Sequence, residues 1–168
     1  FVRMTPDLRP PSPAPPPSSG GPPPRSVLVS ACLLGQRCRH DGRDKLDPAV
    51  VGRASEGIRL VPVCPEELGG LGTPRPAAEL RGGDGGVVLD GGARVVDVNG
   101  RDVTAAFVEG ARRAVAAARA AGATEAWLTE RSPSCGARGT HVDGAVVPGS
   151  GVAAAALARA GLVVRGVG

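Results

Sequence analysis

Ser26-Val-Leu-Val-Ser-Ala31, which leads directly into Cys32, is the stretch from which the fold of this chain can be inferred. A short β-branched run that ends in a cysteine-containing loop is typical of a buried strand. Further strands are predicted at 58–63, 126–129 and 162–165, and helices at 48–56, 104–121 and 151–160. Strands that alternate with helices predict a small, mostly parallel sheet flanked by helices, a Rossmann-like three-layer α/β sandwich.

Two segments depart from this alternation. Residues 82–98 alternate apolar pairs with Gly and Asp, and Leu89-Asp-Gly-Gly-Ala93 predicts a turn between two strands, so an inserted β-hairpin is expected there. Residues 1–25 contain ten prolines between Pro6 and Pro24, a composition that predicts a disordered N-terminal tail. One folded domain is therefore expected, spanning residues 26–168.

Composition and charge narrow the classes of function. The formal net charge is +4 without a polybasic patch, so nucleic acid is not indicated as a partner. Apolar runs are far shorter than the ~20 residues of a membrane-spanning helix. The N-terminus lacks the pattern of a secretory signal, which predicts the reducing cytoplasm, where the four cysteines are thiols or metal ligands. Nothing in the sequence indicates an oligomeric state.

Three cysteines follow predicted strands. Cys32 comes after the first strand, Cys64 after the second, and Cys135 shortly after the strand at 126–129. The carboxyl ends of parallel strands meet at one edge of a sheet, so the three thiols are expected to face one pocket. Each could instead be a small buried apolar residue. As ligands they suit zinc, with Cys38 or His40 completing a tetrahedron, or a four-iron cluster with one open iron.

The segments around the cysteines carry longer motifs. These are Val29-Ser-Ala-Cys-Leu-Leu-Gly-Gln-Arg-Cys-Arg-His-Asp-Gly42, Pro62-Val-Cys-Pro-Glu-Glu-Leu-Gly-Gly-Leu-Gly-Thr-Pro-Arg75 and Ser132-Pro-Ser-Cys-Gly136. Shorter ones are Asn99-Gly-Arg-Asp-Val-Thr104, Val142-Asp-Gly144 and Gly149-Ser-Gly-Val152. Together, and in this order, they resemble the family of the 2-thiouracil desulfidases over essentially all of residues 26–168.

The resemblance implies a 4Fe-4S cluster held by Cys32, Cys64 and Cys135. It implies non-redox hydrolysis that removes sulfur from a small thiolated pyrimidine such as 2-thiouracil and releases sulfide. Cys38 lies in a family-like motif but is a less favoured ligand, because a fourth thiolate would close the cluster. Desulfuration of thiolated tRNA nucleosides, or a non-catalytic zinc-stabilised binding module, are the alternatives.

Hydrolysis calls for a base and a hydroxyl near the thiols. Glu66 is the preferred base, Ser132 or Ser134 would hold the substrate, and Asp41 is a minor acid–base candidate. The alternatives are structural: Glu66 in the first turn of a helix after Pro65, the serines as turn residues, and Asp41 as part of an Asp-Gly turn.

Four further features carry open alternatives. His40 and His141 stand where the family usually has Tyr; either both are replacement rings, or one of them is a proton shuttle or an extra ligand. Arg75 either clamps a substrate or pairs with Glu79. The amides that open the helix after Gly149-Ser-Gly151 could receive an anion or a carbonyl.

Overall fold

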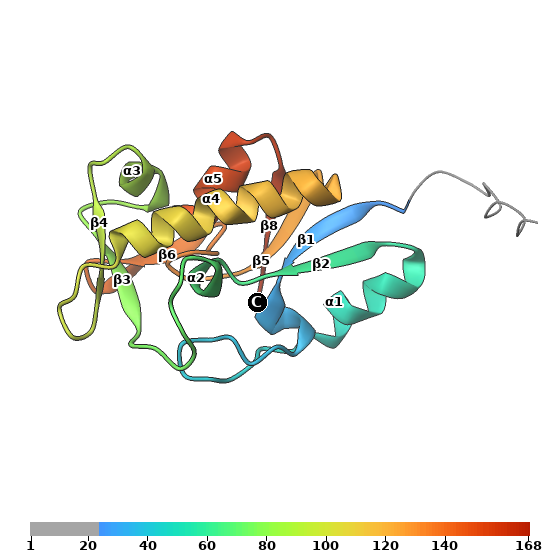
Figure 1. Ribbon diagram of the computed structural model, residues 1–168, viewed down its shortest axis with the longest axis horizontal. Coiled ribbons are helices and arrows are strands. Elements are labelled where there is room, and N and C mark those ends of the chain that lie inside the picture. Colours follow the sequence, from blue (N-terminus) through green and yellow to red (C-terminus); the bar gives the residue numbers. More distant parts are fainter. Residues whose placement is uncertain (1–23) are drawn as a thin grey trace, which may run out of the picture.

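A computed structural model describes residues 24–168, and nearly all of the predicted proline-rich tail lies outside this range. The first of its two sheets is entirely parallel, in the order β2-β1-β5-β8 (Figure 1). Its strands are β1 (Ser26–Ser30), β2 (Arg59–Val63), β5 (Glu125–Thr129) and β8 (Val163–Val167). The predicted strands are thus confirmed, with shifts of at most two residues at their ends.

Helices cover both faces of this sheet. The faces follow from the alternation of side chains along a strand. On one face Leu28 packs with α4 (Thr104–Ala121) and α5 (Val152–Arg159). On the other, Val27 and Val29 pack with Val50 of α1 (Pro48–Gly52). The three-layer α/β sandwich expected from the sequence is confirmed.

The segment that follows β1 returns to the sheet through short helices. A 3-10 turn, η1 (Ala31–Leu34), follows β1 directly, and a second one, η2 (Arg53–Glu56), extends α1. The Asp47 carboxylate accepts the amides of Ala49 and Val50 at 2.9 and 3.3 Å, so the predicted N-cap of α1 is correct.

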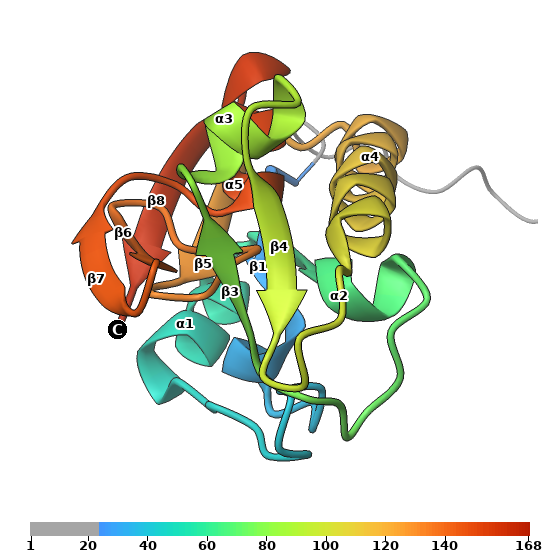
Figure 2. The same ribbon diagram turned by 90° about the vertical axis from the view of Figure 1, so that its left-hand side faces the viewer.

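The short helix α2 (Pro65–Leu68) is pressed against α4 (Figure 2). A Cβ at Gly69 would overlap the carbonyl oxygen of Ala106, and one at Gly110 would overlap that of Pro65. Two glycines therefore let the backbones of α2 and α4 approach closely. This contact fixes the segment that begins at Cys64.

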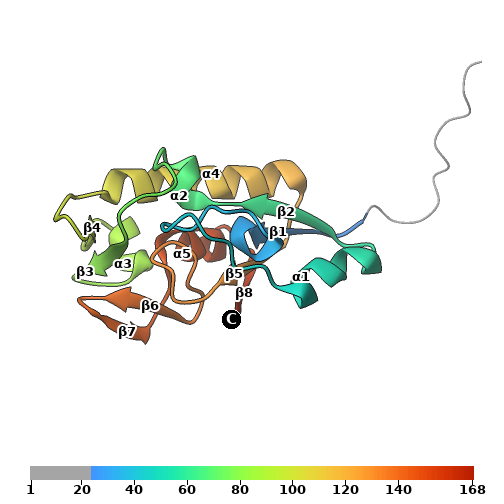
Figure 3. The ribbon, with the colours of Figure 1, turned by 90° about the horizontal axis from the view of Figure 1, so that it is seen from below.

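A second sheet, in the order β4-β3-β6-β7, stands at the end of the domain opposite α1 (Figure 3). Its strands are β3 (Ala78–Arg81), β4 (Arg94–Asp97), β6 (Gly139–Val142) and β7 (Ala145–Pro148). Strands β6 and β7 form a hairpin whose turn residues Asp143 and Gly144 both have positive φ, as a type I′ turn requires.

The prediction of a hairpin within 82–98 is wrong in its first half. Residues Gly85–Leu89 form the helix α3, so the antiparallel strands β3 and β4 are joined by a helix. The Asp84 carboxylate caps α3 at the Val87 amide, at 3.3 Å, and Gly85 lies against the backbone at Gly151 and Val152. Packing on α5 thus overrides the weak helix propensity of two glycines.

None of the helices within residues 24–168 is both long enough and apolar enough to span a membrane.

Candidate active site

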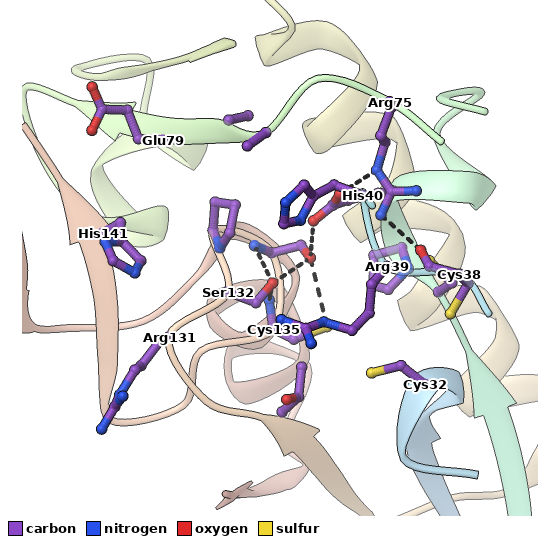
Figure 4. A pocket seen from close by; sticks show the side chains of 18 of the residues that line it. Cys32, Cys38, Arg39, His40, Arg75, Glu79, Arg131, Ser132, Cys135 and His141 are labelled. Atoms are coloured by element: carbon purple, nitrogen blue, oxygen red, sulfur yellow. Dashed lines mark hydrogen bonds and ion pairs between the residues drawn. The ribbon is translucent and has the colours of Figure 1, made fainter. Parts of the chain in front are cut away.

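A cavity of about 770 Å³ lies between the carboxyl edge of the parallel sheet and the second sheet (Figure 4). Cys32 reaches it from η1, Cys64 from the N-cap position of α2, and Cys135 from the loop after β5. Strands β1 and β2 end in register, Ser30 opposite Val63, which brings the first two loops together. The cysteines expected to meet at this edge do line one cavity. Their role as cluster ligands stays a prediction.

Cys38 also lines the cavity, and it is buried. The thiols of Cys32 and Cys64 are near enough to shift its pKa, so these three cysteines lie close together. The Cys64 thiol also lies 3.7 Å from the carbonyl oxygen of Cys38. All four cysteines are free thiols. That Cys38 is a less favoured ligand than the other three cysteines stays a prediction.

The surroundings of the thiols change their acidity. The hydrogen bond from Cys38 lowers the pKa of Cys32, and the same bond raises the pKa of Cys38 to about 12. The hydrogen bond with Cys38 also raises the pKa of Cys64. Burial raises the pKa of Cys135 to about 11, although hydrogen bonds with Ser30 and Ser134 act to lower it. Cys32 is therefore the thiol that ionises first.

The donor set fits an iron–sulfur cluster, which takes cysteine thiolates as ligands. Four free thiols around one cavity provide these ligands for a centre larger than one ion. Across residues 24–168, no three His, Cys, Asp or Glu side chains are grouped so as to hold a single metal ion.

A hydrogen-bonded chain connects a carboxylate to the thiols. Glu66, in the first turn of α2, accepts the Ser134 hydroxyl at 3.0 Å. The same hydroxyl lies 3.6 Å from the Cys135 Sγ atom. Because a hydroxyl has one proton, Ser134 donates to either the carboxylate or the sulfur. The structure therefore places Glu66 and Ser134 beside Cys135.

Ser132 is committed mainly to its own turn. Its Oγ atom accepts the amides of Ser134 and Cys135 at 3.2 and 3.1 Å, and lies 3.1 Å from the Ser134 Oγ atom. The structural alternative, a serine that shapes the turn, describes these contacts directly. Ser132 thus holds Ser134 and Cys135 in place.

Arg75 belongs to the site, and its ion-pair partner differs from the Glu79 that was the alternative expected from the sequence. Its Nε atom donates to Glu66 at 2.6 Å, and both side chains are largely buried, with 7% and 13% exposed. Its Nη2 atom donates to the Cys38 carbonyl at 2.9 Å. The expected alternative pair with Glu79 is absent, since Glu79 accepts Arg81 and the Gly144 amide. The signal for Arg75 was its place at the end of the family-like motif.

Asp41 is not brought to the cavity. Its carboxylate accepts the Arg43 amide at 3.0 Å, and this bond lowers its pKa. The turn interpretation of Asp41-Gly42 is correct, and the acid–base role is not supported. His40 and His141 both line the cavity, His141 from the side of the second sheet (Figure 4).

The N-terminus of α5 holds the loop that carries Cys135. The amides of Val152 and Ala154 donate to the carbonyl oxygens of Pro133 and Ser134 at 2.9 and 3.0 Å. The amides of Val152 and Ala154 are thus used by carbonyls of this loop and are not free for a bound group.

Comparison with known proteins agrees with this site. The family model described as 2-thiouracil desulfurase matches residues 27–166. The chain belongs to the 2-thiouracil desulfurase family. The match extends from β1 to β8 and so includes every cavity-lining element described above.

Two proteins of known sequence or structure are similar to this desulfurase-family chain. The uncharacterised protein YbbK of Bacillus subtilis (strain 168) is 42% identical over 139 residues, which is 80% of this chain and 91% of YbbK. The solved structure of the 4Fe-4S-dependent thiouracil desulfidase TudS matches with a TM-score of 0.72 and 39% identity, over 84% of this chain and 90% of TudS. The resemblance inferred from the motifs is thereby confirmed.

Proposed function

We propose that this chain is an iron–sulfur-dependent desulfidase that hydrolyses the thiocarbonyl of a small thiolated pyrimidine such as 2-thiouracil. The thiocarbonyl and one water give a carbonyl and hydrogen sulfide, with no net transfer of electrons. Membership of the 2-thiouracil desulfurase family and the similarity to TudS support this activity. The free thiols are consistent with a place in the reducing cytoplasm.

The observation that carries the proposal is the juxtaposition of Glu66, Ser134 and Cys135. A carboxylate and a hydroxyl lie beside a buried thiol, in a cavity lined by three more thiols. A hydrolase needs both.

Cys32, Cys64 and Cys135 are proposed to hold the 4Fe-4S cluster. Cys38 is proposed to line the same cavity without being a ligand. When bound, the cluster supplies a Lewis-acidic iron that withdraws electron density from the thiocarbonyl. Glu66 is proposed to take a proton from the attacking water, and Ser134 to hydrogen-bond the substrate or the water. Arg75 would keep the Glu66 carboxylate oriented by its contact at 2.6 Å.

The test is turnover under anaerobic conditions. The protein, reconstituted with iron and sulfide, is incubated with 2-thiouracil, and the loss of thiocarbonyl absorbance is followed together with sulfide release. One sulfide per uracil formed is the expected result. Thiouracil that persists in the presence of a fully loaded cluster would contradict the proposed substrate. Formation of uracil together with oxidised sulfur species, in place of sulfide, would contradict the hydrolytic route.

A further inference from the structure

Glu130 is a buried carboxylate in the cavity wall that the proposed chemistry does not use. It directly follows β5, and only 7% of its side chain is exposed. Its backbone amide continues the pairing with β8 by donating to the Val167 carbonyl at 3.1 Å. The residue is thus held firmly at the carboxyl edge of the parallel sheet.

The carboxylate of Glu130 bonds to the far end of the loop that it begins. It accepts the Arg138 amide at 3.2 Å and the Gly139 amide at 3.3 Å. The Arg138 Nε atom adds an ion pair at 3.1 Å. Residues 131–139 therefore leave the sheet at Glu130 and return to its side chain, which closes the loop.

This closed loop carries Ser132, Ser134 and Cys135, three of the residues assigned to the site. One side of it is anchored by the amides of α5, through the carbonyls of Pro133 and Ser134. The Glu130 carboxylate anchors the other side. The backbone adds a bond from the Arg131 amide to the Gly139 carbonyl at 3.2 Å. Together these attachments define a single position for the thiol, as a functional site on a loop requires.

Gly166 provides the space for this arrangement. It lies on β8 next to Glu130, and a Cβ built there would overlap the Glu130 Oε1 atom and stand 2.9 Å from its Cγ. Its φ is not positive, so the glycine is explained by the close approach and not by backbone conformation. The absence of a side chain at residue 166 therefore makes room for the Glu130 carboxylate in this position.

We propose that Glu130 is a positioning residue of the site: its carboxylate closes the loop 131–139, holds Ser134 and Cys135 at the cavity, and depends on Gly166 for its position. The effect on the cluster rests on the proposed function. The effect on the loop does not.

The first arm of the test is hydrogen–deuterium exchange of the full chain without cluster, read by mass spectrometry over residues 131–140. Glu130→Ala is expected to speed exchange of this segment about tenfold or more, because its amides lose a charged acceptor. Glu130→Gln keeps one acceptor oxygen and should fall between wild type and Glu130→Ala. Gly166→Ala should also speed exchange, although the carboxylate is retained.

Glu125→Ala is the matched control. Glu125 begins β5, the strand that Glu130 follows, and is a largely buried carboxylate. It accepts Trp127 Nε1 at 2.8 Å and pairs with Arg165 at 2.7 Å. Its loss should lower the Tm and leave exchange of 131–140 at the wild-type rate. Unchanged loop exchange in Glu130→Ala, or equal acceleration in Glu125→Ala, would overturn the proposal.

The second arm measures how fast a chelator removes iron from the reconstituted proteins. Faster loss is expected for Glu130→Ala and Gly166→Ala, and wild-type loss for Glu125→Ala. A wild-type chain that binds no iron would refute the proposed function, while the exchange arm still decides the role of Glu130. Accelerated exchange with unchanged iron loss would refute the link from the loop to Cys135.

Discussion

Glu66 and Ser134, 68 residues apart in the sequence, are joined by a hydrogen bond of 3.0 Å across the cavity. Glu66 is placed by the helix α2, which two glycines allow to pack closely on α4. Ser134 is placed by the loop that is hydrogen-bonded to the N-terminus of α5. Each side of the bond is thus held by the backbone of a different element. A carboxylate fixed in this way is preorganised for proton transfer beside the thiols.

Replacing the carboxylate should stop turnover and leave the cysteines untouched. Glu66→Gln keeps the size of the side chain and a weaker acceptor for Ser134, but it removes the base. Thiouracil turnover should fall by about 10² to 10⁴-fold, the usual contribution of a general base. Iron content and the visible spectrum of the cluster should match the wild type. A variant with normal turnover would assign the proton transfer to another group.

The buried pair of Arg75 and Glu66 should be sensitive to the shape of the cation. Arg75→Lys keeps the charge but cannot bond Glu66, Thr73 and the Cys38 carbonyl at once. Arg75→Met leaves a buried carboxylate without its partner, which should cost about 3–5 kcal/mol in the free energy of unfolding. Urea unfolding measures this loss.

In Arg75→Lys, kcat is expected to fall by more than the loss of stability explains, because the Arg75 guanidinium no longer fixes the Oε2 atom of Glu66. Arg81→Lys is a control, since Arg81 pairs with Glu79 at a more exposed position. A kcat for Arg75→Lys equal to that of Arg81→Lys would show that the orientation of Glu66 does not matter.

The contact between α2 and α4 should not tolerate a methyl group. In Gly110→Ala the new Cβ would overlap the Pro65 carbonyl oxygen, so α2 must move. Overpacking of this kind costs about 1–3 kcal/mol, and the displacement of Glu66 should lower kcat as well. Gly52→Ala is the matched control, because nothing lies within 4 Å of a Cβ there. A similar loss of kcat in both variants would contradict this role of Gly110.

The carboxylate of Glu130 should make stability depend on acid pH. Burial acts to raise its pKa, but the hydrogen bonds from Arg138 and two amides outweigh burial and hold the pKa below its ordinary value. A depressed folded pKa adds stability that is complete above the unfolded pKa and is lost as pH falls through the folded value.

The difference in unfolding free energy between wild type and Glu130→Gln is therefore expected to be about 1–3 kcal/mol at pH 7. It should shrink as pH falls below about 4. Urea unfolding at a series of pH values measures it. A difference that stays constant down to pH 2 would mean that the lost charge plays no part in closing the loop.

The sequence predicted those parts of the structure that depend on local pattern. The strand Ser26–Ser30, the cap at Asp47 and the cysteines at strand ends all follow from short-range signals, and each was found. The parallel arrangement then follows from the alternation of strands and helices. The expectation that three loops meet at one edge needed no knowledge of side-chain geometry.

The missed features depend on tertiary contacts. Helix α3 contains two glycines and forms because it packs on α5, which no local pattern reveals. The partner of Arg75 is nine residues away on another element, so helical spacing pointed to Glu79 instead. The closeness of Cys38 to two other thiols, and the closure of a loop by Glu130, likewise require the folded chain.

The central claim is that the thiols around this cavity hold a 4Fe-4S cluster. The most direct test is the iron and acid-labile sulfide content of the anaerobically purified chain, with zinc measured in the same sample. About four irons and four sulfides per chain are predicted, falling to background in Cys32→Ala, Cys64→Ala and Cys135→Ala. Stoichiometric zinc without iron would contradict the account.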